Sequence, residues 1–399
     1  MTTELNHQER VQAAIRHEIT DRIPCDFLAT TEVWHNLIEH FRPDTTGLDD
    51  LHWLEPEREA ILRRLEVDCR LFSYDMFCAP PEGVLTPGAR VDWWGSFTRS
   101  TPNRMWRQVL PDGTLFDIWG EHRKIETHSF GQYEAHTNWV LGDAMSIDDL
   151  KGHAWPTPEW WDFSELPAMI DRLQQDGPFH IRFRLGSFFE EAWGLRGLEQ
   201  FMLDFALDPS IPAYMMDRIL EVHLANLKAV LDLAGDKLDT IYTYDDVATQ
   251  NSLLISPKAW RELVKPRHQK ILDLIHSYGK TAMYHCDGAV APLIPELIEM
   301  GVDVLNPVQP DSRGMEPETL KTQYGDQLTF HGGVDIIKTL PRGTTEQVQK
   351  EVRARVQVLG EGGGYIMCSS HHIQPDTSLD NVLAMYDPAL RVIEQNGLH

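Results

Sequence analysis

The chain has 399 residues and carries 61 acidic against 36 basic side chains, which gives a formal net charge of −25. This excess of negative charge argues against nucleic acids and anionic membrane surfaces as partners, because both bind clustered lysine and arginine. The hydrophobic fraction of 42% is ordinary for a globular chain that can bury a sizeable core. Neither a signal-peptide pattern nor an apolar stretch long enough to span a bilayer stands in the sequence. Five widely spaced cysteines are not a disulfide framework, so we expect a cytoplasmic protein.

Eight short apolar runs are predicted to be strands, and most of them end in polar residues. They cover residues 22–30, 67–72, 179–184, 239–244, 281–288, 302–305, 328–331 and 364–368. Helical patterns lie between them, and strands that alternate with helices indicate a parallel sheet. Eight such units predict a single α/β domain over residues 1–399, a (β/α)8 TIM barrel whose active site lies at the carboxyl ends of the strands.

The clearest predicted helix follows the seventh run. Val348, Val352, Val356 and Leu359 recur at helical spacing. Thr344 with Gln347 predicts a capping box, and Gly360 a C-terminal stop. Residues 293–298 show a similar apolar face, and residues 260–275 predict a further helix that bends or breaks at Pro266.

Residues 77–165 do not follow the alternation of strands and helices. This segment is rich in glycine and proline and holds eight of the twelve tryptophans: Trp93, Trp94, Trp106, Trp119, Trp139, Trp155, Trp160 and Trp161. Residues 108–115 predict a β-hairpin, because Pro111-Asp112-Gly113 separates two β-rich flanks. We interpret the segment as a β-rich insertion between the second and third barrel strands that forms a lid or wall over the site, with Trp94 contacting substrate. For most of these tryptophans, a place in the insertion's own core is the simpler interpretation.

The fifth run ends in His285-Cys286-Asp287-Gly288 and is the leading candidate site. Alternate residues of a strand share a face, so His285 and Asp287 are expected to point together and Cys286 away from them, as a buried thiol. Imidazole and carboxylate are both good ligands for zinc or iron. The competing interpretation is a buried histidine held by a neighbouring carboxylate.

A metal site needs a third protein ligand, and the end of the eighth run offers two. Cys368 would complete a set of histidine, aspartate and a soft thiolate. His371 would complete two histidines and one carboxylate, the facial triad used by non-haem iron as well as by zinc. The residues alone leave the choice open, and each also has an interpretation as an ordinary polar residue of a loop.

Other polar side chains stand at predicted strand ends. Asp245 and Asp246 could act as general base or hold substrate, or Asp245-Asp246 could cap the next helix. Arg182 and Arg184 share one strand face; facing the barrel interior they would bind a carboxylate substrate, and facing the helices they would need acidic partners. Further candidates with the same kind of location are Asn306, Gln309, His331, Asp335 and Gln374.

Several of these motifs together resemble the uroporphyrinogen decarboxylase-like superfamily, which contains haem-pathway decarboxylases and cobalamin- or corrinoid-linked methyltransferases. The resemblance covers about residues 239–397. It rests on Asp245-Asp246, Gln250, Ile255-Ser256-Pro257, Lys265-Pro266, His285-Cys286-Asp287-Gly288, residues 295–303, Asn306-Pro307-Val308-Gln309, His331-Gly332-Gly333-Val334-Asp335, Gly363-Gly364-Tyr365-Ile366 and His371-His372-Ile373-Gln374. The resemblance implies a TIM barrel.

Two departures from the superfamily's patterns limit the reaction. The arginine-rich N-terminal motif of the porphyrinogen decarboxylases is missing near residues 22–30, which argues against porphyrinogen decarboxylation. The zinc methyltransferases use His-x-Cys and a distant cysteine, whereas here Asp287 stands in place of the first thiolate. A carboxylate makes the metal harder, which weakens the case for activating a thiol.

The resemblance makes a methyltransferase the leading expectation: a zinc-dependent enzyme that moves methyl groups from a small O- or N-methylated substrate, with iron or another divalent metal as alternatives. The resemblance also allows for a corrinoid cofactor, or a corrinoid protein as partner. His285, Asp287 and Cys368 or His371 would bind the metal, and Asp245, Asp246 and His331 would be catalytic. Arg182, Arg184, Asn306, Gln309 and Trp94 would contact substrate. The alternatives are a decarboxylase or other lyase acting on a small carboxylate, and a non-catalytic protein that binds a ligand or a corrinoid.

Overall fold

The computed structural model describes residues 4–48, 55–84, 86–94, 105–128 and 131–393. Its centre is a curled sheet of seven parallel strands in the order β1-β7-β8-β9-β10-β11-β12. The strands are β1 Cys69–Ser73, β7 His180–Arg184, β8 Thr240–Tyr244, β9 Thr281–His285, β10 Val304–Val308, β11 Thr329–Val334 and β12 Tyr365–Ser369. Seven of the eight predicted strands are therefore confirmed, each within a few residues of its expected bounds.

The first predicted strand is the exception. Among the described residues, the segment around Cys25 makes only isolated parallel bridges: Cys25 pairs with Met367 of β12, and Ala29 pairs with Ile373 in the loop after β12. It also accepts a backbone hydrogen bond from the residue before β1, since the amide of Asp68 donates to the carbonyl of Cys25 over 2.9 Å. The segment thus lies between β12 and β1, in the position that the eighth strand of the barrel would occupy. Pro24 has no backbone N–H to donate, which limits regular pairing here.

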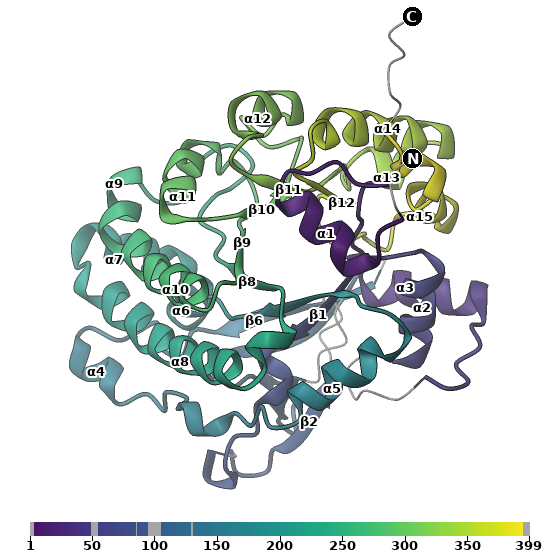
Figure 1. Ribbon diagram of the computed structural model, residues 1–399. Helices are drawn as coiled ribbons and strands as arrows, with labels where there is room; N and C mark the ends of the chain where they lie inside the picture. Colours follow the sequence, from purple (N-terminus) through teal and green to yellow (C-terminus); the bar gives the residue numbers. More distant parts are fainter. Residues whose placement is uncertain (1–3, 49–54, 85, 95–104, 129–130, 394–399) are drawn as a thin grey trace, which may run out of the picture.

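Helices cover the outside of the sheet (Figure 1). They are α1 His7–Ile15, α2 Thr31–Phe41, α3 Pro56–Arg64, α4 Ile147–Lys151, α5 Leu166–Leu173, α6 Phe189–Arg196, α7 Leu198–Leu207, α8 Ser210–Ala234, α9 Pro257–Ala259, α10 Lys265–Ser277, α11 Ile294–Met300, α12 Pro317–Tyr324, α13 Thr339–Arg342, α14 Thr345–Gly360 and α15 Leu379–Met385. In the described part of the chain, none of these helices has both the length and the apolar character that a membrane span requires.

Two helix predictions can be compared directly with the structure. The capping box of Thr344 and Gln347 is present at the start of α14, so that prediction is confirmed. The predicted break at Pro266 takes the form of a π-helical turn, Trp260–Val264, between α9 and α10. Proline cannot donate the backbone hydrogen bond that an α-helix needs, and a wider turn before it accommodates the loss.

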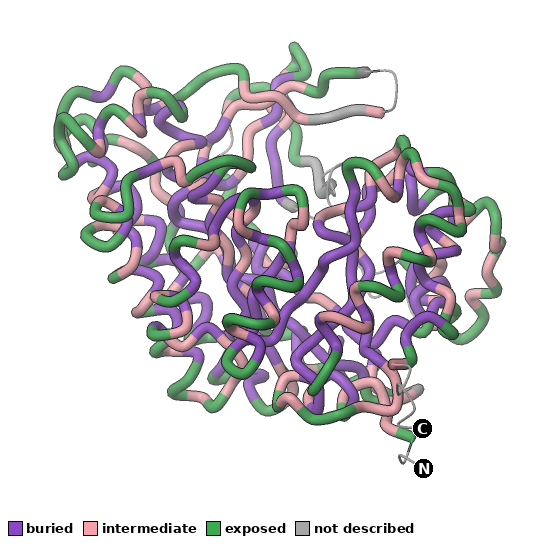
Figure 2. The backbone as a smooth tube through the Cα atoms, turned by 90° about the horizontal axis from the view of Figure 1, so that it is seen from above, coloured by how far each residue is buried: buried purple, intermediate pink, exposed green. Residues whose placement is uncertain are grey.

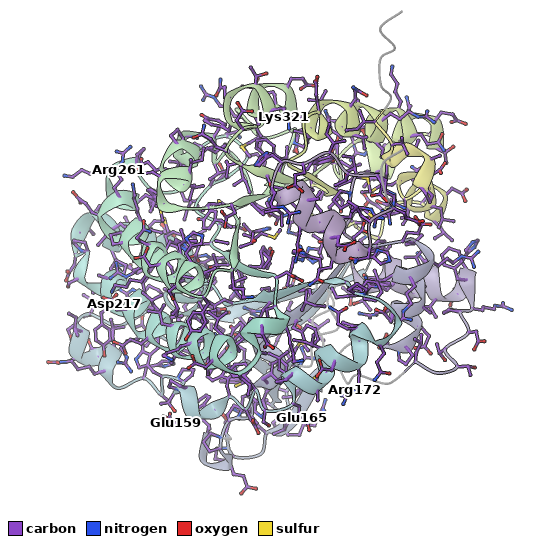
Figure 3. All side chains as sticks on the ribbon, in the orientation of Figure 1. Glu159, Glu165, Arg172, Asp217, Arg261 and Lys321 are labelled. Atoms are coloured by element: carbon purple, nitrogen blue, oxygen red, sulfur yellow. The ribbon has the colours of Figure 1, made fainter. Side chains whose placement is uncertain are left out.

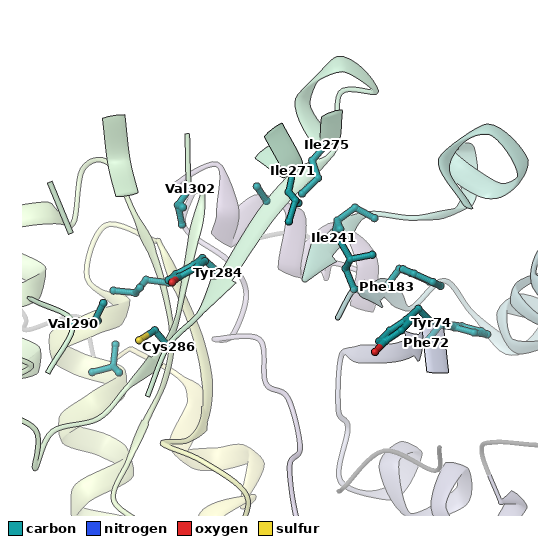
Figure 4. Packing of buried hydrophobic residues seen from close by; sticks show 14 of the residues in the cluster. Phe72, Tyr74, Phe183, Ile241, Ile271, Ile275, Tyr284, Cys286, Val290 and Val302 are labelled. Carbon is teal, nitrogen blue, oxygen red and sulfur yellow. The ribbon is translucent and has the colours of Figure 1, made fainter. Parts of the chain in front are cut away.

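The core fills the layer between the sheet and the helices. Phe183, Ile241 and Tyr284 are buried, and Figure 4 shows them with Ile271 and Ile275 of α10. Cys286 is buried in the same layer, as the alternation of faces predicted, and burial raises the pKa of its thiol well above the usual range. Figure 2 shows the buried strands at the centre of the molecule and exposed residues on the outer turns.

Between β1 and β7 the chain forms a second, antiparallel sheet of five strands in the order β2-β3-β4-β5-β6. Its strands are β2 Arg90–Trp94, β3 Met105–Val109, β4 Leu115–Phe116, β5 His122–His128 and β6 Gly131–Asn138. Trp106, Trp119 and Trp161 are buried, whereas the side chain of Trp94 lies outside the described residues. The role of this segment as a lid or wall stays a prediction.

Candidate metal centre

The candidate site lies at the carboxyl ends of the parallel strands. Strand pairing sets Tyr244, His285 and Asn306 beside one another on β8, β9 and β10. Asp287 follows β9 by two residues, and His371 follows β12 by two residues. Parallel strands end at the same edge, so these side chains meet although they are far apart in the sequence.

His285, Asp287 and His371 form a compact group of ligand atoms, all within 4.8 Å of one another. Nε2 of His285 lies 3.6 Å from Oδ1 of Asp287, and Nε2 of His371 lies 3.4 Å from Oδ2. Oδ1 of Asp287 is buried and has no hydrogen-bond partner among the described residues. Two imidazoles and one carboxylate, of which one oxygen lacks a hydrogen-bond partner, fit a divalent metal ion such as zinc or iron.

The orientation of His285 is fixed by residues behind it. Nδ1 of His285 donates to Oδ1 of Asn306 over 2.5 Å, which leaves the Nε2 lone pair directed at the group. Nδ2 of Asn306 donates to Nδ1 of His331 over 2.6 Å, and Nε2 of His331 donates to Oδ2 of Asp26 over 2.9 Å. Such hydrogen bonds select the tautomer of a metal-binding histidine. His331 therefore acts through Asn306, behind the ligand atoms.

Electrostatics supports this arrangement. Burial acts to raise the pKa of the Asp26 carboxyl, but the charge of Arg182 and the hydrogen bond from His331 outweigh it and hold that pKa well below its usual range. Burial lowers the pKa of His331, which favours the neutral ring that the hydrogen-bond chain requires. Asp26 is thus a buried anion that orders the chain of side chains leading to His285.

We predict that replacing Asn306 by alanine weakens divalent metal binding by roughly 10–100-fold, because His285 loses the acceptor that fixes its tautomer. Zinc titration against a competing chelator measures this affinity. The exposed Asn251, in the loop after β8, supplies the control variant Asn251→Ala. Equal zinc affinities for Asn306→Ala and Asn251→Ala would contradict the assigned orientation.

Cys368 lies apart from this group. It is buried on β12, in a second cluster with Asp26 and His331, and burial raises the pKa of its thiol well above the usual range. A buried thiol beside an anion is poorly suited to supply a thiolate. Of the two alternatives for the third ligand, the structure brings only His371 to His285 and Asp287.

This geometry makes a paired prediction. His371→Ala is expected to strip the protein of most of its metal, whereas Cys368→Ser is expected to keep it, because only His371 contributes to the group. Elemental analysis of both purified variants gives the answer. Metal lost from Cys368→Ser and kept in His371→Ala would show that the ligand set contains the thiolate.

Asp246 and Glu190 add carboxyl groups beside the centre. Oδ1 of Asp246 accepts the backbone N–H of Asp287 over 2.7 Å and lies 3.7 Å from Nε2 of His285. Oε1 of Glu190 accepts the backbone N–H of Asp246 over 2.9 Å. Burial and the neighbouring Asp287 raise the pKa of Asp246, with His285 acting in the opposite direction. Burial and the Asp246 carboxylate raise the pKa of Glu190, so this pair can hold a proton at the site.

Asp245 is turned away from its neighbour. It is buried, and its Oδ1 accepts hydrogen bonds from the Ser187 hydroxyl and from the backbone N–H of Phe189, the latter over 2.9 Å. Nε2 of His268 lies 2.9 Å from Oδ2. These contacts place the carboxylate at the start of α6, where backbone N–H groups need acceptors. Asp245 therefore anchors a helix and does not reach the ligand atoms.

Both candidate arginines point into the barrel, and both already have acidic partners. Arg182 contacts Asp26, and Arg184 contacts Asp75 and donates to the Ser73 hydroxyl over 3.0 Å. Neither guanidinium is left uncompensated to clamp a carboxylate substrate. Both side chains face the barrel interior, as the first of the two alternatives predicted. Both pair with acidic residues, which the second alternative, a face toward the helices, predicted.

The remaining predicted residues support loops. Oε1 of Gln309 accepts the backbone N–H of Gly288 over 2.5 Å and so fixes the turn after Asp287. Gly288 has φ +86°, and a Cβ there would lie 2.4 Å from the carbonyl oxygen of Thr249, so only glycine fits. Asp335 accepts two backbone N–H groups of its own turn, and Gln374 donates to the carbonyl of His372.

Four contributing residues are not among the residues predicted from the sequence: Asp26, Glu190, Tyr242 and Tyr244. The rings of Tyr242 and Tyr244 stack with centroids 6.2 Å apart, and both stand nearly perpendicular to the His285 ring. They form an aromatic wall beside the centre. Alternation along 239–244, which places both tyrosines on the face of Arg182 and His285, is the signal that points to them.

Fold and site together define an α/β barrel with a candidate metal centre at the carboxyl ends of its strands. The family model of uroporphyrinogen decarboxylase (URO-D) matches residues 184–391, more than half of the chain. The chain belongs to this family, so the resemblance found in the sequence is confirmed. The family's fold is the TIM barrel.

One solved structure similar to this chain is a methyltransferase from Methanosarcina mazei. Its TM-score is 0.63 at 20% sequence identity, and the match covers 97% of this chain and 98% of that chain. At this identity the likeness shows the fold alone. No curated protein matches the chain.

Proposed function

We propose that the protein is a metal-dependent methyltransferase or demethylase that acts on a small O- or N-methylated substrate. The observation that carries this proposal is the group of His285, Asp287 and His371, with its unbonded buried carboxylate oxygen. Membership of a superfamily that contains decarboxylases and methyltransferases supports it.

His285, Asp287 and His371 would hold the ion, for which zinc is our first choice and iron the alternative. The bound ion would act as a Lewis acid toward the heteroatom that carries the methyl group. The side chains of His285 and His371 are 13% and 32% exposed, so a small substrate can reach them.

The protein's own residues would handle the substrate and the proton. Tyr242 and Tyr244 offer an apolar wall against which an aromatic ether or a methylated amine would lie. Asp246, whose pKa is raised by burial and whose carboxyl lies 3.7 Å from Nε2 of His285, would deliver a proton to the heteroatom as the methyl group leaves it. The methyl group would pass to a corrinoid, and the tryptophan-rich segment would shield the site.

The competing lyase hypothesis requires a positive clamp for a small carboxylate. Arg182 and Arg184 are the residues predicted to bind such a carboxylate, and both are paired with aspartates. Three carboxyl groups, those of Asp246, Asp287 and Glu190, surround the centre instead. With both arginines paired, neither is available to bind a carboxylate, which favours a neutral or cationic methylated substrate.

The test is a methyl-transfer assay with a panel of aryl methyl ethers and methylated amines and a reduced corrinoid as acceptor. We expect the spectrum of the corrinoid to change only with metal-loaded protein, and Asp246→Asn to slow the reaction by roughly 10²–10⁴-fold. Asn251→Ala serves as the control. Release of carbon dioxide from small carboxylates, with no methylation of the corrinoid, would contradict the proposal.

A further inference from the structure

A basic pocket lies away from the metal centre, between α13 and the first half of α14. Its volume is about 440 Å³, within the range of roughly 300–1,000 Å³ typical of small-ligand sites. Lys338, Arg342 and Lys350 line it, together with Thr339, Gln347 and Glu351. Figure 1 shows α13 beside α14 at the outer layer of the barrel.

The pocket is basic, although the chain as a whole is acidic. Acidic side chains outnumber basic ones by 61 to 36. Some basic side chains elsewhere on the surface meet an acid: Lys265 contacts Glu296 and Glu299, and Arg261, labelled in Figure 3, contacts Glu296.

The three basic side chains of the pocket line it together without such a partner in the described part of the chain. Among the described residues, no ion pair joins Lys338, Arg342 or Lys350 to a carboxylate. Glu351, the one acid of the lining, is engaged elsewhere: its Oε1 accepts from the backbone N–H of Asp335 over 3.0 Å and from Arg355 over 3.3 Å. The pocket therefore concentrates about three positive charges that the protein itself does not neutralise.

The walls of the pocket are built from fixed elements. The buried Asn381 donates two hydrogen bonds of 2.8 Å, to the carbonyls of Leu340 and Gly343, which hold α13 and its end in place. The Thr344 capping box fixes the start of α14, with Oε1 of Gln347 accepting from the backbone N–H of Thr344 over 2.8 Å. A Cβ at Gly343 would lie 2.6 Å from the carbonyl oxygen of Thr339, so this wall tolerates only glycine without a shift.

We propose that this pocket binds a small molecule through a phosphate group. A phosphate dianion matches an arginine fork and two lysine point charges better than a single carboxylate does. The Thr339 hydroxyl supplies a neutral hydrogen-bond donor or acceptor at the same place. This proposal goes beyond the proposed function and stands without it, because it uses neither the metal centre nor a methyl group.

The test is calorimetric titration of the purified full-length chain with inorganic phosphate, in a phosphate-free buffer of constant ionic strength. Glycerol phosphate and glycerol form a second pair of titrants, of which only the first is expected to bind. The double variant Arg342→Glu/Lys350→Glu is expected to weaken phosphate binding by at least about tenfold. Both substituted side chains are exposed, so the variant is expected to fold, and circular dichroism verifies this.

Two control variants distinguish phosphate bound in this pocket from phosphate bound elsewhere on the protein. Lys270→Glu makes the same type of charge change at an exposed position of α10 and is expected to alter affinity by less than about twofold. His285→Ala is expected to leave phosphate binding unchanged, which separates the pocket from phosphate bound at a metal ion. Absence of saturable binding, equal binding by the double variant, or loss of binding in either control would overturn the proposal.

Discussion

Substitution of His285 by alanine is expected to reduce the metal content of the purified protein to a trace. His285 would supply one of the three protein ligands of the proposed centre, and its Nε2 is held toward the group by the hydrogen bond to Asn306. Two remaining ligands do not retain zinc against dilution, since stable protein sites use at least three. Elemental analysis measures the loss directly, and methyl transfer is expected to disappear with it.

The matched control is His276→Ala. His276 lies on the surface at the end of α10 and pairs with Asp303 over 3.2 Å, away from the centre. Its removal is expected to change neither the metal content nor the transfer rate. A native protein without metal, or a His285→Ala variant with full metal content, would refute the metal centre.

The second large effect is expected at Asp68, in the segment that leads into β1. Its side chain is fully buried and contacts Arg10 over 2.8 Å, Arg22 over 3.0 Å and His7 over 2.8 Å, and it accepts the backbone N–H of Cys25 over 2.8 Å. Asp68→Ala would leave the buried Arg10 with fewer counter-charges and the amide of Cys25 without an acceptor. We expect a loss of about 3–5 kcal/mol in the free energy of unfolding, measured by urea denaturation.

The same aspartate makes the stability depend on pH. Burial acts to raise its pKa, but the hydrogen bond from His7 and the charges of Arg22 and Arg10 outweigh it and hold the pKa at about 2, below the ordinary value of 3.8. A depressed pKa stabilises the fold above the unfolded value and loses that contribution as the pH falls from about 4 towards 2. The shift corresponds to about 2 kcal/mol.

The control for this effect is Asp148→Ala, at an exposed carboxylate of α4 that pairs with Lys151. It is expected to change stability by at most about 1 kcal/mol. If Asp68→Ala unfolds at the same urea concentration as Asp148→Ala, the buried cluster does not stabilise the fold as argued.

Much of the barrel could be predicted from the sequence, because buried parallel strands are short apolar runs separated by helical patterns. The limits appear where backbone chemistry is irregular. Pro24 reduces the first predicted strand to isolated bridges. The seventh predicted strand ends at His331 with its apolar run, whereas β11 continues through Gly332 and Gly333, which have φ of +106° and +95°.

The site was predictable only in part, for a geometric reason. The rule that side chains at strand ends meet brought His285 and Asp287 to the centre, but it could not choose between Cys368 and His371. That choice depends on the residue at which β12 leaves the sheet. Asp26 was missed because its partner His331 lies 305 residues away, a separation that only barrel closure bridges.

The hydrogen-bond chain from Asp26 through His331 and Asn306 to His285 has a consequence for how the protein matures. It crosses the seam at which the beginning of the chain meets its last strands. The orientation of His285, a proposed metal ligand, is thus fixed only after the ring of strands has closed, so metal binding at the proposed centre would report on completed folding. A nascent chain that lacks its final strands has neither His371 nor a closed seam, so the ion would be loaded after synthesis rather than during it.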